Sequence, residues 1–528
     1  MDLNTASSSP NPQARAIRRA GVAVAVAVAA AILGGFCTVA QAQSRTPTEG
    51  SHSQPAAASL PDLGSGANTI LTRADERQIG RLMLRNLREE NAVLDDVESS
   101  EYLQSLGSRI GAAAQDGEQQ ITMFVVRDPT VNAFAIPGGY IGVNTGLILL
   151  TSSESQLAGV VAHETGHVMQ RHIVRAVEAQ AHNSITSIAA MLGAVLIGAV
   201  THSTDAIPGL IAMSQGAAMQ QQINFTRMEE QEADRVGIGY LAAAGYDPTG
   251  MASFFAAMMR DRGAIDDFVP ALLLSHPVDS ARIAEARARL ASLPTYARRP
   301  DSPNYLLARE RIRMLMSPQD TDLRRYYEKM LVNDPGSLAL KYGAALAEVK
   351  AGTPARAVEI LKPLVVAHPE LPLLQSELAQ AQLAAGQGDE AVNTFEHGLQ
   401  LAPRNVPLTV RYAQALLDLD KPKKAHTLLL DLFNVVAPAP EQIKLIALAA
   451  SSAGDTGDAY YYMSEYDISN GDLMLATTQL DLAIAAPGLT EVQRKRFIAR
   501  RDEIRNALRE QRGDRGGGDH GNRGPPPG

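Results

Sequence analysis

The chain has 528 residues, of which 20% are charged, and its formal net charge at pH 7 is −9. An acidic protein lacks the basic surface that nucleic-acid binding requires, so we expect no nucleic-acid partner. Cys37 is the only cysteine, which excludes an intramolecular disulfide and leaves histidine and carboxylate side chains as metal ligands. A chain of this length predicts more than one domain, and its abundant alanine and leucine favour a mainly α-helical fold.

The N-terminus has the pattern of a secretory signal peptide. Arg15, Arg18 and Arg19 precede an apolar run over residues 21–36, and small residues follow at a cleavage position. We therefore predict a cleaved signal peptide over residues 1–42 and a periplasmic protein. The alternative is an uncleaved anchor, for which the apolar run is slightly short.

Residues 43–68 are rich in Ser, Pro, Gly and Thr and are predicted to form a flexible leader. A helical pattern follows over residues 73–111, and residues 121–126 and 140–144 predict short strands. A longer helix is then expected from Ser153 to beyond His172, and a capping box formed by Ser153 with Gln156 would start it. His172 lies about 140° around this helix from His167, so we predict that it is not a metal ligand.

Residues 163–167 read His-Glu-Thr-Gly-His. On a helix, His163 and His167 project from one face, so both imidazoles can bind one Zn²⁺. Glu164 lies beside them and is placed to take a proton from a zinc-bound water. A chance occurrence of this pattern on a surface helix is the alternative, but the apolar residues 157–162 predict that the helix is buried.

A catalytic zinc needs a third protein ligand. Glu230 and Asp234 are four residues apart and share one helical face, so one can bind the metal while the other orients a histidine ligand. Spacing alone does not choose between Glu229, Glu230 and Glu232. The alternative is a solvated acidic helix with salt bridges to neighbouring arginines.

The combination of these motifs resembles the M48 peptidase family. The resemblance rests on His-Glu-x-x-His at residues 163–167 and on Glu-x-x-x-Asp about sixty residues later, at residues 230–234. Residues 132–141 are similar to the edge strand that leads to the metal helix of that family. Ser-His-Pro at 275–277, followed by Arg282-Ile283, is similar to its second histidine loop.

The resemblance implies a zincin-like α+β metalloprotease domain with a small sheet, which we place at residues 69–300. It implies one Zn²⁺ per chain, bound by His163, His167 and Glu230, and an accessory acid at Asp234. With Glu164 as the general base, the expected reaction is hydrolysis of peptide bonds by metal-activated water.

His276 has three interpretations. It could donate a hydrogen bond to the oxyanion of a tetrahedral intermediate. It could instead be a fourth zinc ligand that displaces water and switches the enzyme off, or it could be a structural loop residue. A second apolar stretch, residues 185–200, is interpreted as a buried helix or a lid over the zinc cleft rather than a membrane span.

The C-terminal half repeats with a period of 34 residues. Two columns of alanine show it: Ala345, Ala379, Ala413 and Ala447, and Ala357, Ala391, Ala425 and Ala459. This period, with small residues where paired helices touch, is typical of tetratricopeptide repeats. We therefore predict an α-solenoid over residues 301–510, with a groove that binds protein segments, and a disordered tail over residues 511–528.

The resemblance implies a periplasmic endopeptidase that acts in quality control and assembly of outer-membrane β-barrel proteins. Misassembled outer-membrane proteins are the expected substrates, and the barrel-assembly machinery is the expected partner of the repeats. Peripheral association with a membrane stays open. The alternative function is a repeat-based chaperone or scaffold for outer-membrane protein assembly with minor proteolysis.

Overall fold

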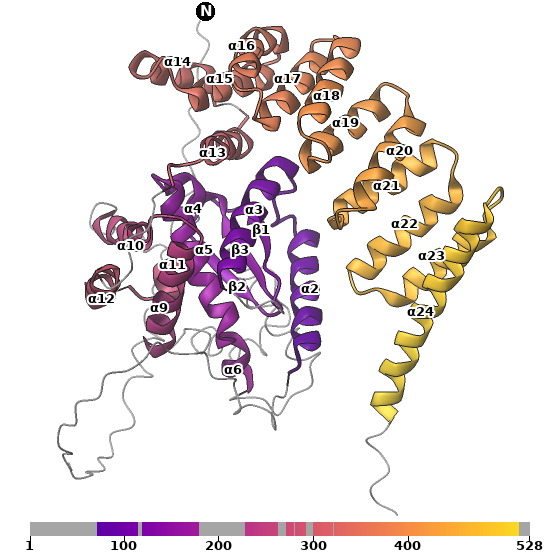
Figure 1. The fold of residues 1–528 in the computed structure, drawn as a ribbon, viewed down its shortest axis with the longest axis horizontal. Coiled ribbons are helices and arrows are strands. Elements are labelled where there is room, and N and C mark those ends of the chain that lie inside the picture. The colour runs from indigo at the N-terminus through magenta and orange to yellow at the C-terminus, as the bar shows by residue number, and fades with distance from the viewer. Residues whose placement is uncertain are drawn as a thin grey trace, which may run out of the picture. The chain divides into compact units, whose positions relative to one another are not determined.

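We describe the protein from a computed structural model, in residues 71–114, 119–178, 227–261, 271–278, 280–291, 299–319 and 321–516. The predicted signal peptide, the leader and the apolar stretch 185–200 lie outside these residues. The first part of the fold combines a small sheet with helices α2 (Arg73–Glu89), α3 (Val97–Ala113), α4 (Thr145–Leu150), α5 (Glu154–Met169), α6 (His172–Glu178), α9 (Arg227–Ala243), α10 (Thr249–Asp261), α11 (Ala271–Ser275) and α12 (Ser280–Leu290) (Figure 1).

The sheet has three strands, β1 (Thr122–Val126), β2 (Ala133–Ile136) and β3 (Tyr140–Asn144), in the order β1-β3-β2. The central strand β3 pairs parallel with β1 and antiparallel with β2. Side chains on β1 alternate between two cores, as the two-residue period of a strand requires. Val125 packs with α3 and α5, whereas Val126 packs with α2, so helices cover both faces of the sheet.

Residues 132–141 were expected to form one edge strand, and this expectation is wrong. They form a hairpin in which Gly138 and Gly139, with φ angles of +85° and +87°, turn the chain from β2 into β3. Glycine adopts such angles without a steric penalty, and the Gly-Gly pair is a typical hairpin signal. The edge position itself belongs to β2, which has one neighbour in the sheet.

The helix with the two histidines is shorter than predicted. Helix α5 is capped by Ser153, whose hydroxyl accepts a hydrogen bond from the backbone N–H of Gln156. It ends at Met169, because Arg171 adopts a left-handed φ of +52° and the chain restarts as α6. His172 therefore begins a new helix instead of continuing the first one.

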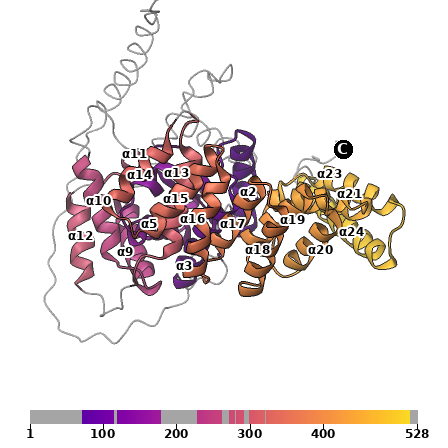
Figure 2. The ribbon, with the colours of Figure 1, turned by 90° about the horizontal axis from the view of Figure 1, so that it is seen from above.

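The predicted repeats are confirmed. The second part of the chain is helical throughout, with α13 (Pro303–Met316), α14 (Leu323–Asn333), α15 (Leu338–Lys350), α16 (Pro354–Ala367), α17 (Pro372–Ala384), α18 (Gly388–Leu401), α19 (Val406–Asp418), α20 (Pro422–Phe433), α21 (Pro440–Ser452), α22 (Thr456–Ser469), α23 (Leu473–Ala485) and α24 (Glu491–Gly516). From α15 to α22 these helices pack in successive pairs, and Figure 2 shows α15 to α21 following one another in order.

Small residues and turns explain the pairing. Ala345, Ala379 and Ala413 are completely buried, so the helices of each pair approach closely. Gly352 and Gly386 have φ angles of +79° and +76° at the turn inside a pair, a conformation that glycine allows. Each repeat therefore buries its apolar face against its neighbours.

Helix α13 connects the two parts. Its Tyr305 and Ile312 belong to the core around α5, whereas its Leu307 belongs to the first core of the repeats. The predicted boundary at residue 300 therefore precedes a helix that both parts share. At the other end, the described residues of α24 extend to Gly516, six residues into the segment predicted to be a tail.

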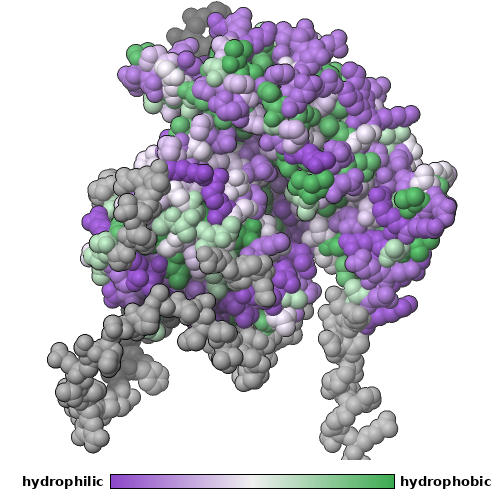
Figure 3. Space-filling model, in the orientation of Figure 1, coloured by the Kyte–Doolittle hydropathy of each residue, from purple (hydrophilic) through white to green (hydrophobic). Residues whose placement is uncertain are grey.

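No helix among the described residues is long and apolar enough to cross a membrane. On the face shown in Figure 3, hydrophobic residues gather in small patches separated by hydrophilic ones. The most exposed large hydrophobic residues of the repeats, Val332 and Val366, are 80% and 82% exposed and occupy equivalent positions at the ends of α14 and α16.

Candidate metal centre

Helices α5 and α9 pack closely because small residues line their contact. A Cβ atom on Gly166 would lie 3.0 Å from the carbonyl oxygen of Ala233, and one on Gly237 would lie 2.9 Å from that of Ala162. The absence of these side chains lets the two backbones approach. As a result, the acids of α9 reach the histidines of α5.

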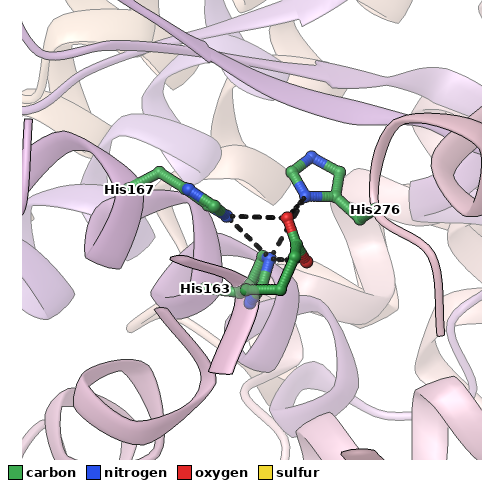
Figure 4. Close-up of side chains that lie close together, drawn as sticks. His163, His167 and His276 are labelled. Carbon is green, nitrogen blue, oxygen red and sulfur yellow. Dashed lines mark hydrogen bonds and ion pairs between the residues drawn. The ribbon is translucent and has the colours of Figure 1, made fainter. Parts of the chain in front are cut away.

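Four side chains of the first part of the chain converge on one buried point. His163 Nε2 and His167 Nε2 are 3.1 Å apart. Glu230 on α9 places Oε2 3.5 Å from His163 Nε2 and Oε1 3.5 Å from His167 Nε2. Figure 4 shows the rings of His163, His167 and His276 turned toward one another.

His276 follows α11 and completes the cluster. Its Nδ1 lies 2.8 Å from Glu230 Oε1 and 3.4 Å from His163 Nε2. One donor atom from each of His163, His167, Glu230 and His276 lies within 4.8 Å of the others, and all four residues are buried. Of the acids that spacing left open, Glu230 is therefore the one that joins the histidines, whereas Glu232 contacts His172.

The cluster fits a zinc ion. Two ligands of a tetrahedral zinc with bonds of 2.0–2.1 Å lie about 3.3 Å apart, which is close to the separations seen here. Imidazole nitrogens and carboxylate oxygens are also the donors that zinc accepts. Glu164 is fully buried beside the cluster, and neither of its carboxylate oxygens has a hydrogen-bond partner in the described part of the chain. Its Oε1 does lie 3.6 Å from His276 Nε2. A buried carboxylate without a hydrogen bond is costly, so this group requires a proton or a cation nearby.

Asp234 contacts His163, and Arg282 contacts both Asp234 and Glu230. Asp234 Oδ1 lies 2.9 Å from His163 Nδ1, the ring nitrogen on the side away from Glu230. Arg282 on α12 donates from Nε and Nη2 to both oxygens of Asp234, at 2.8 and 2.9 Å, and its Nη1 lies 2.7 Å from Glu230 Oε2. The same Nη1 donates to the carbonyl oxygen of Pro277 at 2.7 Å, which ties down the loop that carries His276.

Arg282 belongs to the sequence that resembles the family's second histidine loop, but no role at the site was predicted for it. A signal was nevertheless present, because two buried acids on one helix require a cation close to them. What the sequence could not indicate is that the cation comes from a helix about fifty residues downstream.

The electrostatics follow from this arrangement. Burial alone would lower the pKa of His163, but its contacts with Asp234 and Glu230 raise that pKa to about 10. Burial holds the pKa of His167 well below its usual value, which leaves this ring neutral and able to bind a metal. Although burial opposes it, the neighbouring His276 and His163 hold the pKa of Glu230 far below its usual range, so Glu230 is ionised.

His172 was predicted not to be a metal ligand, and it is not among the four clustered residues, but the expectation that it continues the helix of His167 is wrong. Because α5 ends before Arg171, the chain turns back and places His172 Nδ1 2.7 Å from His167 Nδ1. His172 Nε2 lies 3.3 Å from Glu232 Oε2. His172 therefore contacts the Nδ1 atom of His167, whose Nε2 belongs to the cluster, and is not itself a member of the cluster.

Two family models match the chain, one of them over the residues that carry this cluster. The model of peptidase family M48 matches residues 98–290, which include α5, α9 and α11, and a tetratricopeptide-repeat model matches residues 382–448. A thermophilic tetratricopeptide-repeat protein of Thermus thermophilus, a solved structure, covers 34% of this chain and 92% of its own at 20% identity, with a TM-score of 0.26.

Two curated relatives match across both parts of the chain. A Vibrio cholerae protein with the name beta-barrel assembly-enhancing protease is 35% identical over 365 residues, which are 69% of this chain and 75% of the relative. The beta-barrel assembly-enhancing protease of Escherichia coli K12 is 29% identical over 451 residues, which are 84% of this chain and 91% of the relative. The chain therefore belongs to peptidase family M48, and it is a metalloendopeptidase with C-terminal tetratricopeptide repeats.

Proposed function

We propose that the chain is a zinc-dependent endopeptidase of the periplasm that acts in quality control and assembly of outer-membrane β-barrel proteins. The observation that carries the proposal is the buried cluster of three imidazoles and one carboxylate next to Glu164, whose carboxylate oxygens accept no hydrogen bond among the described residues. The signal-peptide pattern over residues 1–42 supports the compartment. The names of the two relatives support the substrate class.

His163, His167 and Glu230 would hold the zinc, which when bound supplies Lewis-acid activation of water. Glu164 then accepts the proton of the attacking water at a carboxylate oxygen and passes it to the leaving amine. Asp234 keeps the His163 ring in place through Nδ1, so that Nε2 faces the cluster. Arg282 holds Asp234 and Glu230 in their ionised forms.

We assign His276 as a fourth zinc ligand in the resting enzyme. Its Nδ1 is 2.8 Å from Glu230 Oε1 and 3.4 Å from His163 Nε2, and its Nε2 is 3.6 Å from Glu164 Oε1. In this position the imidazole would occupy the fourth ligand position, which the attacking water would otherwise take. On this assignment His276→Ala raises hydrolysis, whereas an oxyanion donor would lower it by about 10²–10³-fold when removed.

Strand β2 offers a place for the substrate. It lies at the edge of the sheet and contacts α5, which carries the two histidines. An extended polypeptide that pairs with this edge gains backbone hydrogen bonds with little selection for side chains. This mode of binding suits a protease that acts on unfolded segments of many sequences.

The decisive experiment replaces Glu164 by glutamine. The variant should keep one zinc per chain, because Glu164 is not among the ligands, and should lose at least about 10²-fold in the rate of cleavage of an unfolded protein. Glu370→Gln, on an exposed side chain of the repeats, is the control and should cleave normally. Full activity of the purified chain after chelation of its metal would refute the proposal.

A chaperone or scaffold is the second candidate function, because the repeats have the form of a protein-binding solenoid. The barrel-assembly machinery would then bind the repeats, and proteolysis would be minor. Normal outer-membrane assembly in the Glu164→Gln strain, together with its loss when residues 335–490 are deleted, would favour this function over the protease.

A further inference from the structure

A second group of possible metal ligands lies in the repeats, far along the chain from the first cluster. It consists of His426 on α20, Asp455 immediately before α22, and Asp458 in the first turn of α22. One donor atom from each residue lies within 4.8 Å of the other two. His426 and Asp458 are buried, at 7% and 4% exposure.

The Nε2 atom of His426 lies next to Asp458 but makes no hydrogen bond with it. This nitrogen is buried and has no hydrogen-bond partner in the described residues. It nevertheless lies 3.5 Å from Asp458 Oδ2, the same separation as between His163 Nε2 and Glu230 Oε2. Two ligands of one tetrahedral zinc are expected about 3.3 Å apart, whereas a hydrogen bond would be shorter and aligned. A buried ring nitrogen without a partner is costly, and a metal ion would remove that cost.

The two carboxylates are already held in place. Asp458 Oδ1 lies 2.5 Å from Arg496 Nη2 on α24, which leaves Oδ2 for the position next to His426. Asp455 Oδ1 accepts the backbone N–H of Asp458 at 2.9 Å, and its Oδ2 accepts from Gln493 Nε2 at 3.0 Å. Ligating carboxylates in metal sites are commonly oriented by such hydrogen bonds, and each oxygen keeps a further lone pair.

We propose that His426, Asp455 and Asp458 form a second divalent-cation site, which takes Zn²⁺ and completes its coordination with water. Two carboxylates and one guanidinium give the site a net negative charge, which favours a cation. The ion would join α20 to α22 and, through Arg496 and Gln493, to α24. Because stability in a solenoid is a sum over neighbouring contacts, the site would strengthen the C-terminal end of the repeats.

The experiment uses the full chain with His163→Asn and His167→Asn, so that zinc at the first cluster does not interfere. Native mass spectrometry after incubation with Zn²⁺ should show one zinc per chain, and Co²⁺ should give the visible absorption of a tetrahedral site. Adding His426→Gln should abolish both signals. The same change at His397, an exposed histidine on α18, is the matched control and should leave them unchanged.

Asp455→Asn provides an independent variant, since asparagine caps a helix as well as aspartate does and the fold is kept. It should weaken zinc binding at least tenfold and remove the rise in Tm that zinc produces. Absence of zinc from the background chain, retention of zinc after His426→Gln, or an unchanged zinc affinity after Asp455→Asn would overturn the proposal. Neither outcome depends on the catalytic activity of the first cluster.

Discussion

His167 Nδ1 and His172 Nδ1 lie 2.7 Å apart, which is hydrogen-bond distance between two ring nitrogens. One must donate and the other accept. If His167 binds zinc through Nε2, its Nδ1 carries the proton and His172 Nδ1 accepts it. His172 then carries its own proton on Nε2, which faces Glu232 Oε2 at 3.3 Å. The contact sets the tautomer of a candidate metal ligand.

His172→Ala should therefore weaken zinc binding. Loss of a partner that orients a histidine ligand typically costs 10–100-fold in metal affinity, and we expect a fall of about that size. Competition with a chromogenic chelator measures it. His397→Ala, on the repeats, serves as control, and an unchanged zinc affinity in His172→Ala would show that the contact has no orienting role.

Arg282→Gln should destabilise the metal-free enzyme. The change leaves the adjacent carboxylates of Glu230 and Asp234 buried without the cation that contacts both. Breaking a buried pair in this way costs about 3–5 kcal/mol in the free energy of unfolding. Urea denaturation in the presence of a chelator gives the value. Arg287→Gln, at an exposed position of the same helix, should change stability by less than about 0.5 kcal/mol.

A buried ion-pair network joins α3 to the repeats. Arg311 on α13 contacts Asp96 at 2.7 Å and Glu377 on α17 at 2.8 Å, while Arg411 on α19 contacts Glu98 at 2.7 Å. Arg311→Met leaves three buried carboxylates with one arginine, so we expect a loss of about 3–5 kcal/mol.

Because the network lies between two parts of the chain, the unfolding transition of Arg311→Met should also broaden or separate into two steps. Differential scanning calorimetry detects this. Arg325→Met, at a side chain that is 86% exposed, is the control. A single, equally stable transition in Arg311→Met would mean that apolar contacts alone hold the repeats to α3.

Asp467 makes stability depend on pH. Burial, together with repulsion from Asp472, raises the pKa of Asp467 from 3.8 to about 6, and Arg85 only partly opposes this. A carboxyl with a raised pKa favours the folded state when protonated, so its ionisation destabilises the fold progressively as the pH rises from about 4 to about 6.

Asp467→Asn removes that ionisation. The free energy of unfolding of the variant should equal that of the wild type near pH 3.5. Above pH 6 it should be larger by roughly 1–3 kcal/mol, and partial screening by solvent favours the lower figure. Thermal or urea denaturation across this range measures the difference. Asp418→Asn, at an exposed position on α19, should shift stability by less than about 0.5 kcal/mol. A gain for Asp467→Asn that is as large at pH 3.5 as at pH 7 would contradict the assignment.

The features that were predictable from the sequence are those that repeat locally. His163 and His167 share a face because a helix places every fourth residue on the same side. The helices of the repeats begin at intervals of 34 residues, as α15, α17, α19 and α21 show, because each repeat packs on the next with the same small residues. The M48 resemblance also pointed to Glu230, Asp234 and His276, which the fold brings to one point.

Other features depend on contacts between distant segments. No periodic pattern in the sequence predicts three of these features. They are the helix break at Arg171 that brings His172 to His167, the contact of Arg282 with Asp234, and the helix α13 that both parts share. The sequence by itself determined which residue types could bind a metal and where the chain repeats, since both follow from short-range geometry. Only the tertiary structure decided which histidine contacts a metal-ligand histidine and which arginine neutralises the buried acids. The reason is that burial and charge compensation depend on groups that are distant in the sequence and that the fold brings together.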